Sequence, residues 1–111
     1  MREILFRGKR PSDSKWVRGY YQEYPQGYVH IQNDNLDWTP VIPETVGQYV
    51  GRKDRNGRKI FEGDVVKSSW GYSGVVEFDS FIYAMCEGMV SEDIEIIGNI
   101  FDNPDLAVSR R

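Results

Sequence analysis

The chain has 111 residues, of which 40% are apolar and 14% aromatic, and its formal net charge is −3. This size and composition predict one folded domain with a single hydrophobic core and exclude a disordered protein. Because Cys86 is the lone cysteine, an internal disulfide and a cysteine-based zinc site are excluded, and a reducing, cytoplasmic location is favoured. No run approaches the roughly 20 apolar residues of a membrane-spanning helix, and residues 1–8 lack the apolar centre of a signal peptide. A soluble protein is therefore expected.

The charges are segregated along the chain. Residues 1–59 carry eleven Lys/Arg and seven Asp/Glu (+4), and residues 60–111 carry three Lys/Arg and ten Asp/Glu (−7), which sum to −3. Such asymmetry can steer a charged partner or let copies of the protein attract each other. The simpler interpretation, a pair of solvated surfaces, is favoured over both.

The first 44 residues predict a β-meander followed by a connection. Strands are expected at residues 4–6, 15–22 and 28–32, the first ended by Gly8. Residues 33–44 are expected to cross the surface as a connection, because Pro40 and Pro43 exclude a regular helix or a central strand there. Within it, Trp38 is interpreted as a packed loop aromatic rather than as the wall of a groove.

Residues 45–106 predict a barrel-like part, and residues 107–111 a frayed tail. Asn56-Gly57 is the strongest short hairpin signal, and it predicts a type I′ turn, which needs positive φ at both residues. Gly63 and Asp64 predict the next tight turn. Further strands are expected at residues 65–67, 75–78 and 94–97, and Asn103-Pro104 predicts the start of one helical turn. The apolar run at residues 81–86 is a buried strand or a helical turn, and its β-branched and aromatic content favours the strand.

The fold class follows from this count of short elements. Eight or nine strands without a long amphipathic helix predict a mainly β, antiparallel fold in one domain covering residues 1–111. The tight corners between Gly63 and Phe78 favour an SH3-like barrel in the C-terminal half, preceded by the N-terminal meander.

No catalytic, cofactor-binding or metal-ligating set is predicted, and an enzyme is disfavoured. His30 lies on an expected strand without a marked nucleophile or orienting acid, and Cys86 lies in an apolar run typical of an inert thiol. A gathered pair of carboxylates could act in acid–base chemistry or bind a divalent cation. Structural roles are favoured for the carboxylates, several of which flank turns or alternate with apolar strand residues. They are Glu62, Asp64, Glu77, Asp79, Glu92, Asp93 and Glu95.

The densest positive charge lies on the expected hairpin. Its basic side chains could contact a nucleic-acid backbone, with Trp70 or Tyr72 as stacking aromatics. Against this, the chain as a whole is acidic, and basic residues at a hairpin edge also prevent aggregation between sheets. The candidate contact surface consists of Arg52, Lys53, Arg55, Arg58 and Lys59.

Residues 48–66 read Gln-Tyr-Val-Gly-Arg-Lys-Asp-Arg-Asn-Gly-Arg-Lys-Ile-Phe-Glu-Gly-Asp-Val-Val. This stretch resembles the central signature of the YopX family, small phage and prophage proteins of bacteria. The resemblance extends to residues 2–7, 43–47, 74–78 and 95–106, and so covers nearly the whole chain. Val50 and Arg52 depart from it, since Thr and Leu are more usual there. The resemblance implies a phage-derived cytoplasmic protein with a largely β fold, and it supplies no activity, cofactor or functional residue.

The sequence therefore predicts a non-enzymatic phage accessory protein that acts through protein–protein interaction. A nucleic-acid-binding module that uses the hairpin at residues 52–59 is the alternative, and a carboxylate-dependent enzyme comes third. The expected partner is a host or phage protein, and no membrane contact is expected. Self-association of the basic N-terminal half with the acidic C-terminal half of a neighbour is a further hypothesis.

Overall fold

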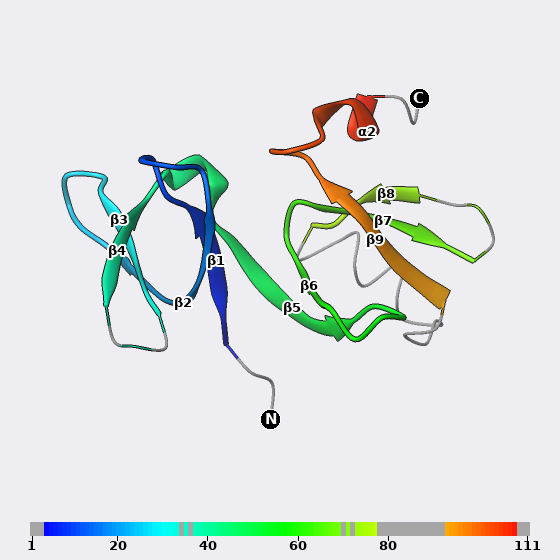
Figure 1. Ribbon diagram of the computed structural model, residues 1–111, viewed down its shortest axis with the longest axis horizontal. Coiled ribbons are helices and arrows are strands. Elements are labelled where there is room, and N and C mark those ends of the chain that lie inside the picture. Colours follow the sequence, from blue (N-terminus) through cyan, green and yellow to red (C-terminus); the bar gives the residue numbers. More distant parts are fainter. Residues whose placement is uncertain are drawn as a thin grey trace. The chain divides into compact units, whose positions relative to one another are not determined.

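The computed structural model describes residues 4–33, 35, 37–69, 71, 73–77 and 93–108. The chain divides into two compact units, Met1–Tyr49 and Val50–Arg111. Strand β5 (Gly47–Lys53) begins in the first unit and ends in the second (Figure 1). Both units consist mainly of short antiparallel strands, which confirms the mainly β fold. In the described part of the chain, no helix has the length and apolar character needed to span a membrane.

The first unit is a four-stranded meander to which the start of β5 is added. The strands follow the order β4-β3-β2-β1-β5, and each is antiparallel to its neighbour. The predicted N-terminal meander is thus confirmed. The elements are β1 (Phe6–Lys9), β2 (Trp16–Glu23), β3 (Val29–Gln32), β4 (Trp38–Val41) and the 3-10 turn η1 (Pro43–Thr45).

Strand β2 pairs with two partners in succession. In its first half Gly19 lies opposite Phe6 of β1, and in its second half Tyr20 lies opposite Gln32 of β3. A Cβ atom at Gly19 would collide with the main-chain carbonyl of Gln32. Glycine is therefore required where β2 passes from one partner to the other.

Side-chain alternation gives this sheet an inner and an outer face. Val29, Ile31 and Val41 form the core cluster of the inner face. Three partly buried side chains pack against it: Phe6, Val17 and Val46. The outer face of β2, β3 and β4 carries the side chains of opposite parity, which are Tyr20, Gln22, His30, Gln32, Trp38 and Pro40.

Two sequence predictions for the first unit are wrong in detail. β1 begins at Phe6 and continues through Gly8 rather than ending there. A Cβ at Gly8 would lie 3.0 Å from the side chain of Val41, so this glycine permits close packing instead of breaking the strand. The connection predicted at residues 33–44 contains the edge strand β4, in which Pro40 lies opposite His30. Proline is tolerated because an edge strand pairs on one side only.

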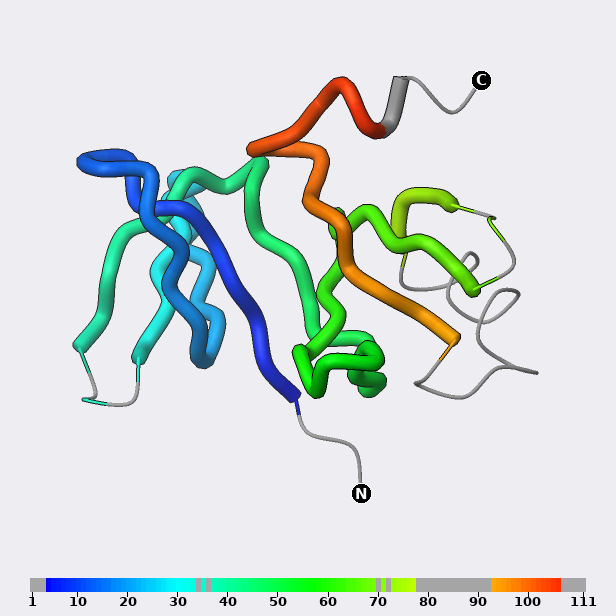
Figure 2. The backbone as a smooth tube through the Cα atoms, turned by 45° about the vertical axis from the view of Figure 1, so that its right-hand side comes forward, coloured from blue at the N-terminus to red at the C-terminus, as the bar shows by residue number. Residues whose placement is uncertain are grey.

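The second unit contains the β5–β6 hairpin and a three-stranded sheet with the order β8-β7-β9. β7 and β9 are far apart in the sequence but lie side by side (Figures 1 and 2), with a bulge between Val65 and Val66. The elements are β6 (Lys59–Phe61), β7 (Asp64–Ser68), β8 (Ser73–Val75), β9 (Ile94–Asn99) and α2 (Pro104–Val108). The core cluster consists of Val50, Ile60, Val66, Val76, Ile94 and Ile96.

The C-terminal predictions have mixed outcomes. The described strands form two antiparallel sheets and no closed barrel, so the SH3-like barrel stays a prediction. β8 spans Ser73–Val75, so it begins two residues before the predicted start at Val75. Phe78 and the strand expected at 81–86 lie outside the described residues. The helical turn begins at Pro104 as predicted. The Asn103 side chain accepts a hydrogen bond from the Asn99 main-chain N–H (3.3 Å), which ties this turn to the end of β9.

Candidate functional site

Asp54 organises the hairpin that the sequence singled out. Its side chain is buried, with 2% exposure. Oδ1 accepts hydrogen bonds from the main-chain N–H groups of Asn56 (2.9 Å) and Arg58 (2.9 Å). Oδ2 accepts one from the N–H of Ile96 in β9 (3.0 Å). One carboxylate therefore closes the turn and also fastens the hairpin to a strand that is distant in sequence.

The environment keeps Asp54 ionised. Burial by itself raises the pKa of this carboxyl group, but the three main-chain donors and the positive charge of Arg58 outweigh burial and lower the pKa below its ordinary value. A second tie to β9 runs through the main chain, where the Arg55 N–H donates to the Ile94 carbonyl (2.8 Å). The turn of the hairpin is therefore held to β9 at two adjacent residues, Asp54 and Arg55.

The turn is not the type I′ turn that Asn56-Gly57 predicted. Among the described non-glycine residues only Ser14 has positive φ, so Asn56 does not, whereas Gly57 has φ of 80°. The Gly57 N–H donates to the Asp54 carbonyl (3.0 Å) and the Asp54 N–H donates to the Arg58 carbonyl (2.8 Å). This is a type I turn followed by a left-handed glycine. The Asp54 carboxylate decides the outcome, because it binds the N–H groups of Asn56 and Arg58 in this geometry.

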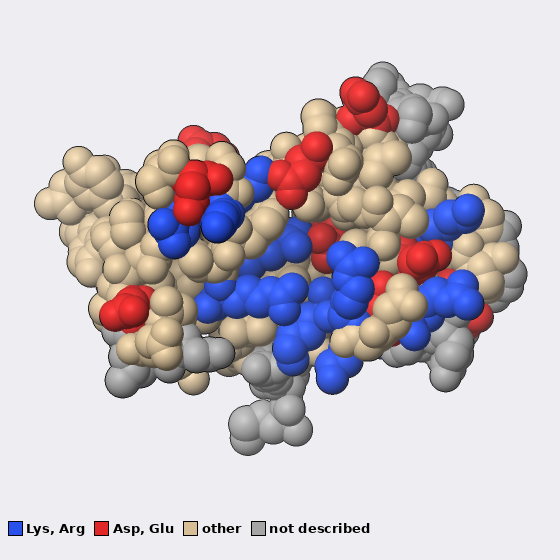
Figure 3. All heavy atoms as spheres, viewed as in Figure 1, with Lys and Arg blue, Asp and Glu red and all other residues tan. Residues whose placement is uncertain are grey.

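The five predicted contact residues are not equally accessible. Lys53, Arg55 and Arg58 are exposed, whereas Arg52 in β5 and Lys59 in β6 are half-buried. Lysine and arginine side chains cover part of the surface over β5 and the hairpin in the space-filling view (Figure 3). The exposed part of the contact surface is therefore smaller than the sequence suggested. We call its three exposed residues, Lys53, Arg55 and Arg58, the hairpin tip.

Gly63 and Asp64 occupy the next corner. Asp64 is buried, with 2% exposure, and its Oδ2 accepts a hydrogen bond from the Phe61 main-chain N–H (2.8 Å). Gly63 has φ of 90°, and a Cβ there would lie 3.0 Å from the ring of Phe101. The structure of this turn therefore explains why glycine and aspartate occupy these two positions.

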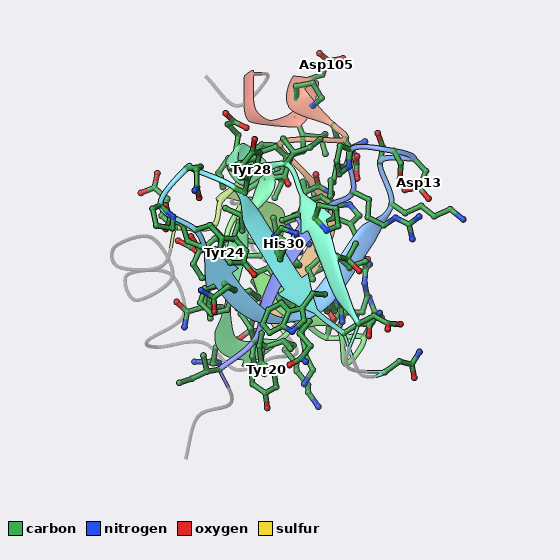
Figure 4. All side chains as sticks on the ribbon, turned by 90° about the vertical axis from the view of Figure 1, so that its left-hand side faces the viewer. Asp13, Tyr20, Tyr24, Tyr28, His30 and Asp105 are labelled. Carbon is green, nitrogen blue, oxygen red and sulfur yellow. The ribbon has the colours of Figure 1, made fainter. Side chains whose placement is uncertain are left out.

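The first unit exposes a group of aromatic side chains that sequence reasoning missed. Tyr20 is 64% exposed, Tyr28 66%, Trp38 45% and Tyr24 40%. Figure 4 shows Tyr20, Tyr24, Tyr28 and His30 on the side of the β2–β3–β4 sheet that faces the viewer. Tyr24 meets His30 edge-on, with ring centroids 5.2 Å apart. We call this surface the aromatic face.

The strand register orders the aromatic face in rows. Tyr20, Gln32 and Trp38 form one row across β2, β3 and β4, and Gln22, His30 and Pro40 form the next. A signal existed in the sequence, because Tyr20 of β2 and Trp38 of β4 occupy outer-face positions that would ordinarily be polar. Beside Trp38, a hollow of about 290 Å³ is lined by Arg10, Pro11, Ser12, Trp38, Thr39 and Pro40.

Other candidates for chemistry remain dispersed. Among the residues that the structure describes, no three His, Cys, Asp or Glu side chains gather in a way that could hold a metal ion. Asp93 accepts a hydrogen bond from the Ser69 hydroxyl (3.3 Å), and Glu95 lies opposite Lys67 between β9 and β7. The stacking candidates Trp70 and Tyr72, the carboxylates Asp79 and Glu92, and Cys86 lie outside the described residues.

Comparison with known proteins gives a family. A family model described as "YopX protein" matches residues 5–107, nearly the whole chain, as the resemblance of residues 48–66 predicted. No curated protein matches the sequence. The match includes both the hairpin and the aromatic face.

Proposed function

The chain belongs to the YopX family, and from this premise we propose that it is a non-enzymatic accessory protein of phage or prophage origin. It acts in the bacterial cytoplasm by binding another protein. The binding surface is the aromatic face of the first unit. The partner is a host or phage protein.

The observation that carries this proposal is the composition of the aromatic face. Tyrosine and tryptophan are enriched in the centres of protein interfaces, where charged residues are depleted. The outer positions of β2, β3 and β4 from Tyr20 onward follow this pattern, because none is charged: Tyr20, Gln22, His30, Gln32, Trp38 and Pro40.

Exposure strengthens the assignment. Tyr20, Tyr28 and Trp38 expose large ring surfaces to water, whereas Val29, Ile31 and Val41 on the inner face of the same sheet are buried. Gathered exposed apolar surface on a folded protein marks a binding site more often than isolated apolar residues do. The two glutamines between the rings supply donors and acceptors that fix the orientation of a partner.

The proposal is tested by capturing the partner with the full chain from the bacterial host and measuring its affinity with purified components. Tyr20→Ala and Trp38→Ala should each weaken binding by about tenfold or more, as central aromatic anchors do. Ile97→Ala is the matched control, because Ile97 is an exposed apolar residue (40%) on β9 of the second unit. Binding that survives both aromatic substitutions contradicts the proposal.

A second copy of the chain is the competing occupant of this surface. Light scattering at high protein concentration and low salt distinguishes the two. A monomeric mass that Trp38→Ala leaves unchanged supports a different partner. A dimer that Trp38→Ala dissociates assigns the face to self-association and overturns the proposed hetero-partner.

A further inference from the structure

The hairpin tip is independent of the aromatic face and has no role in the function proposed above. We propose that Lys53, Arg55 and Arg58 form a second binding site, which takes the phosphates of a nucleic-acid backbone without reading base sequence. This site does not depend on the protein partner. The rigidity of the tip, its charge and its lack of apolar anchors support this assignment.

The tip is preorganised. Asp54 binds the main-chain N–H groups of Asn56 and Arg58 within the turn and that of Ile96 in β9. The Arg55 main chain is fastened to β9 as well, through the Ile94 carbonyl. Because the backbone that carries the cations is already fixed, binding does not have to order it, which removes one of the costs of association.

The charge at the tip is one-sided. Residues 52–59 contain a single carboxylate, Asp54, and it is 2% exposed and bound to three N–H donors. The exposed ionised side chains of this segment are therefore all cationic: Lys53, Arg55 and Arg58. An approaching phosphate meets positive charge first. The guanidinium groups of Arg55 and Arg58 can each bind two phosphate oxygens.

The same composition disfavours a protein partner at the tip. Arginine anchors a protein interface where it is buried in a well-packed pocket, usually among aromatic residues, whereas exposed charges at the rim contribute little affinity. Residues 52–59 contain no aromatic or aliphatic side chain apart from the stems of their basic residues. A rigid two-stranded ribbon with cationic residues at its end suits a nucleic-acid groove, where phosphates flank both sides.

The number of contacts sets a measurable salt dependence. Each phosphate contact contributes about −0.9 to the slope of log affinity against log salt for duplex DNA, and about −0.7 for single strands. Three contacts predict a duplex slope of about −2.7. The net charge of −3 repels the rest of the duplex, so binding is expected to be weak and confined to low salt.

The experiment measures binding of the full chain to a short mixed-sequence DNA duplex, by fluorescence anisotropy, over a range of low salt concentrations. Arg55→Ala and Arg58→Ala should each reduce the magnitude of the slope by about 0.9. Arg55→Lys and Arg58→Lys retain the charge and should leave the slope in place. Lys15→Ala is the matched control, because it removes one positive charge from an exposed position in the first unit.

Each outcome decides the proposal. The proposal is supported if the magnitude of the slope decreases in the alanine variants and not in Lys15→Ala. This holds for duplex and for single-stranded DNA, since both present phosphates. Absence of binding at low salt, an equal effect of Lys15→Ala, or slopes unaffected at Arg55 and Arg58 would each overturn it. Equal binding to poly-glutamate would also overturn it, because the tip would then recognise acidic protein. Trp38→Ala should not change DNA binding, so failure of either proposal is visible separately.

Discussion

The two units use their charged and aromatic residues in opposite ways. In the second unit the carboxylates Asp54 and Asp64 are buried and accept hydrogen bonds from main-chain N–H groups. In the first unit the described buried polar side chains are Arg7 and Thr45, while five of the described aromatic side chains are exposed. Buried polar groups and exposed apolar groups are the informative departures from ordinary burial. Exposed aromatic side chains distinguish the first unit, and buried carboxylates distinguish the second.

The difference separates residues that serve folding from residues that serve contact. Asp54 and Asp64 satisfy the buried N–H groups of Ile96 and Phe61, which would otherwise have no partner, so they contribute to stability. The exposed rings of Tyr20 and Trp38 satisfy no such need, because the core beneath them is made by Val29, Ile31 and Val41. Substitutions in the two units should therefore affect stability very differently.

The largest expected effect is at Asp54. Asp54→Ala leaves the N–H groups of Asn56, Arg58 and Ile96 without the carboxylate that binds them, and it should lower the free energy of unfolding by about 3–4 kcal/mol. Urea unfolding measures the loss. Asp54→Asn keeps one acceptor oxygen, so its free energy of unfolding should lie between those of Asp54→Ala and the native chain. A loss within the range of ordinary surface substitutions would mean that the carboxylate does not organise the hairpin.

The counterpart in the first unit is Gly19. Gly19→Ala places a Cβ against the main-chain carbonyl of Gln32 and should lower the free energy of unfolding by about 2–3 kcal/mol, because a backbone must move. Gly27→Ala is the control in the same unit. Gly27 has φ of 94° but nothing within 4 Å of its Cβ position, so only the backbone cost of about 1 kcal/mol is expected. Equal losses in the two variants would argue against close approach as the cause.

Acid should weaken the second unit through Asp54. Its pKa is lowered in the folded protein below the ordinary value of 3.8, so the unfolded chain binds its proton first as pH falls. The stability contributed by Asp54 is fully present above about pH 4. It is lost progressively as pH drops from there through the folded pKa. Urea unfolding at decreasing pH should show that the free energy of unfolding declines less steeply for Asp54→Asn than for the native chain. Parallel declines in the two proteins would exclude Asp54 as the titrating group.

The smallest expected effect on stability belongs to the aromatic face. Tyr20→Ala and Trp38→Ala should each change the free energy of unfolding by no more than about 0.5 kcal/mol, as exposed substitutions do. Thermal unfolding followed by circular dichroism is sufficient to check this. Losses comparable to that of Gly19→Ala would show that these rings support the fold, and would remove the contrast between the two units.

Much of the local structure could be predicted from the sequence. The meander strands, the hairpin and the turn at Gly63 were predicted because alternating apolar residues and glycine-containing turns act over a few neighbouring residues. Local signals also misled. Gly8 predicted a strand end, and Pro40, which excluded a helix or a central strand, led to the prediction of a connection instead of an edge strand. Gly8 instead makes room for Val41 across the sheet, and Pro40 lies on an edge where one side needs no pairing.

The candidate site was predicted in part. The sequence placed five cations on the hairpin, and the structure leaves Lys53, Arg55 and Arg58 exposed while Arg52 and Lys59 are half-buried. The aromatic face was missed, because alternation defines two faces of a strand without saying which one meets the core. Tyr20 and Tyr21 are adjacent and identical in type, yet Tyr21 stacks on Phe6 at 5.0 Å while Tyr20 faces solvent.

By itself, then, the sequence determined the all-β character, the position of the hairpin and the family, since all three are carried by local patterns and ordered motifs. Only the tertiary structure decided the turn type, the role of Asp54 and the surface left open for binding. The reason is physical: the third hydrogen bond of Asp54 goes to Ile96, 42 positions along the chain, and the exposed face is whatever the core leaves uncovered. Contacts of that kind form between residues that are distant in the sequence, so the neighbouring residues do not predict them.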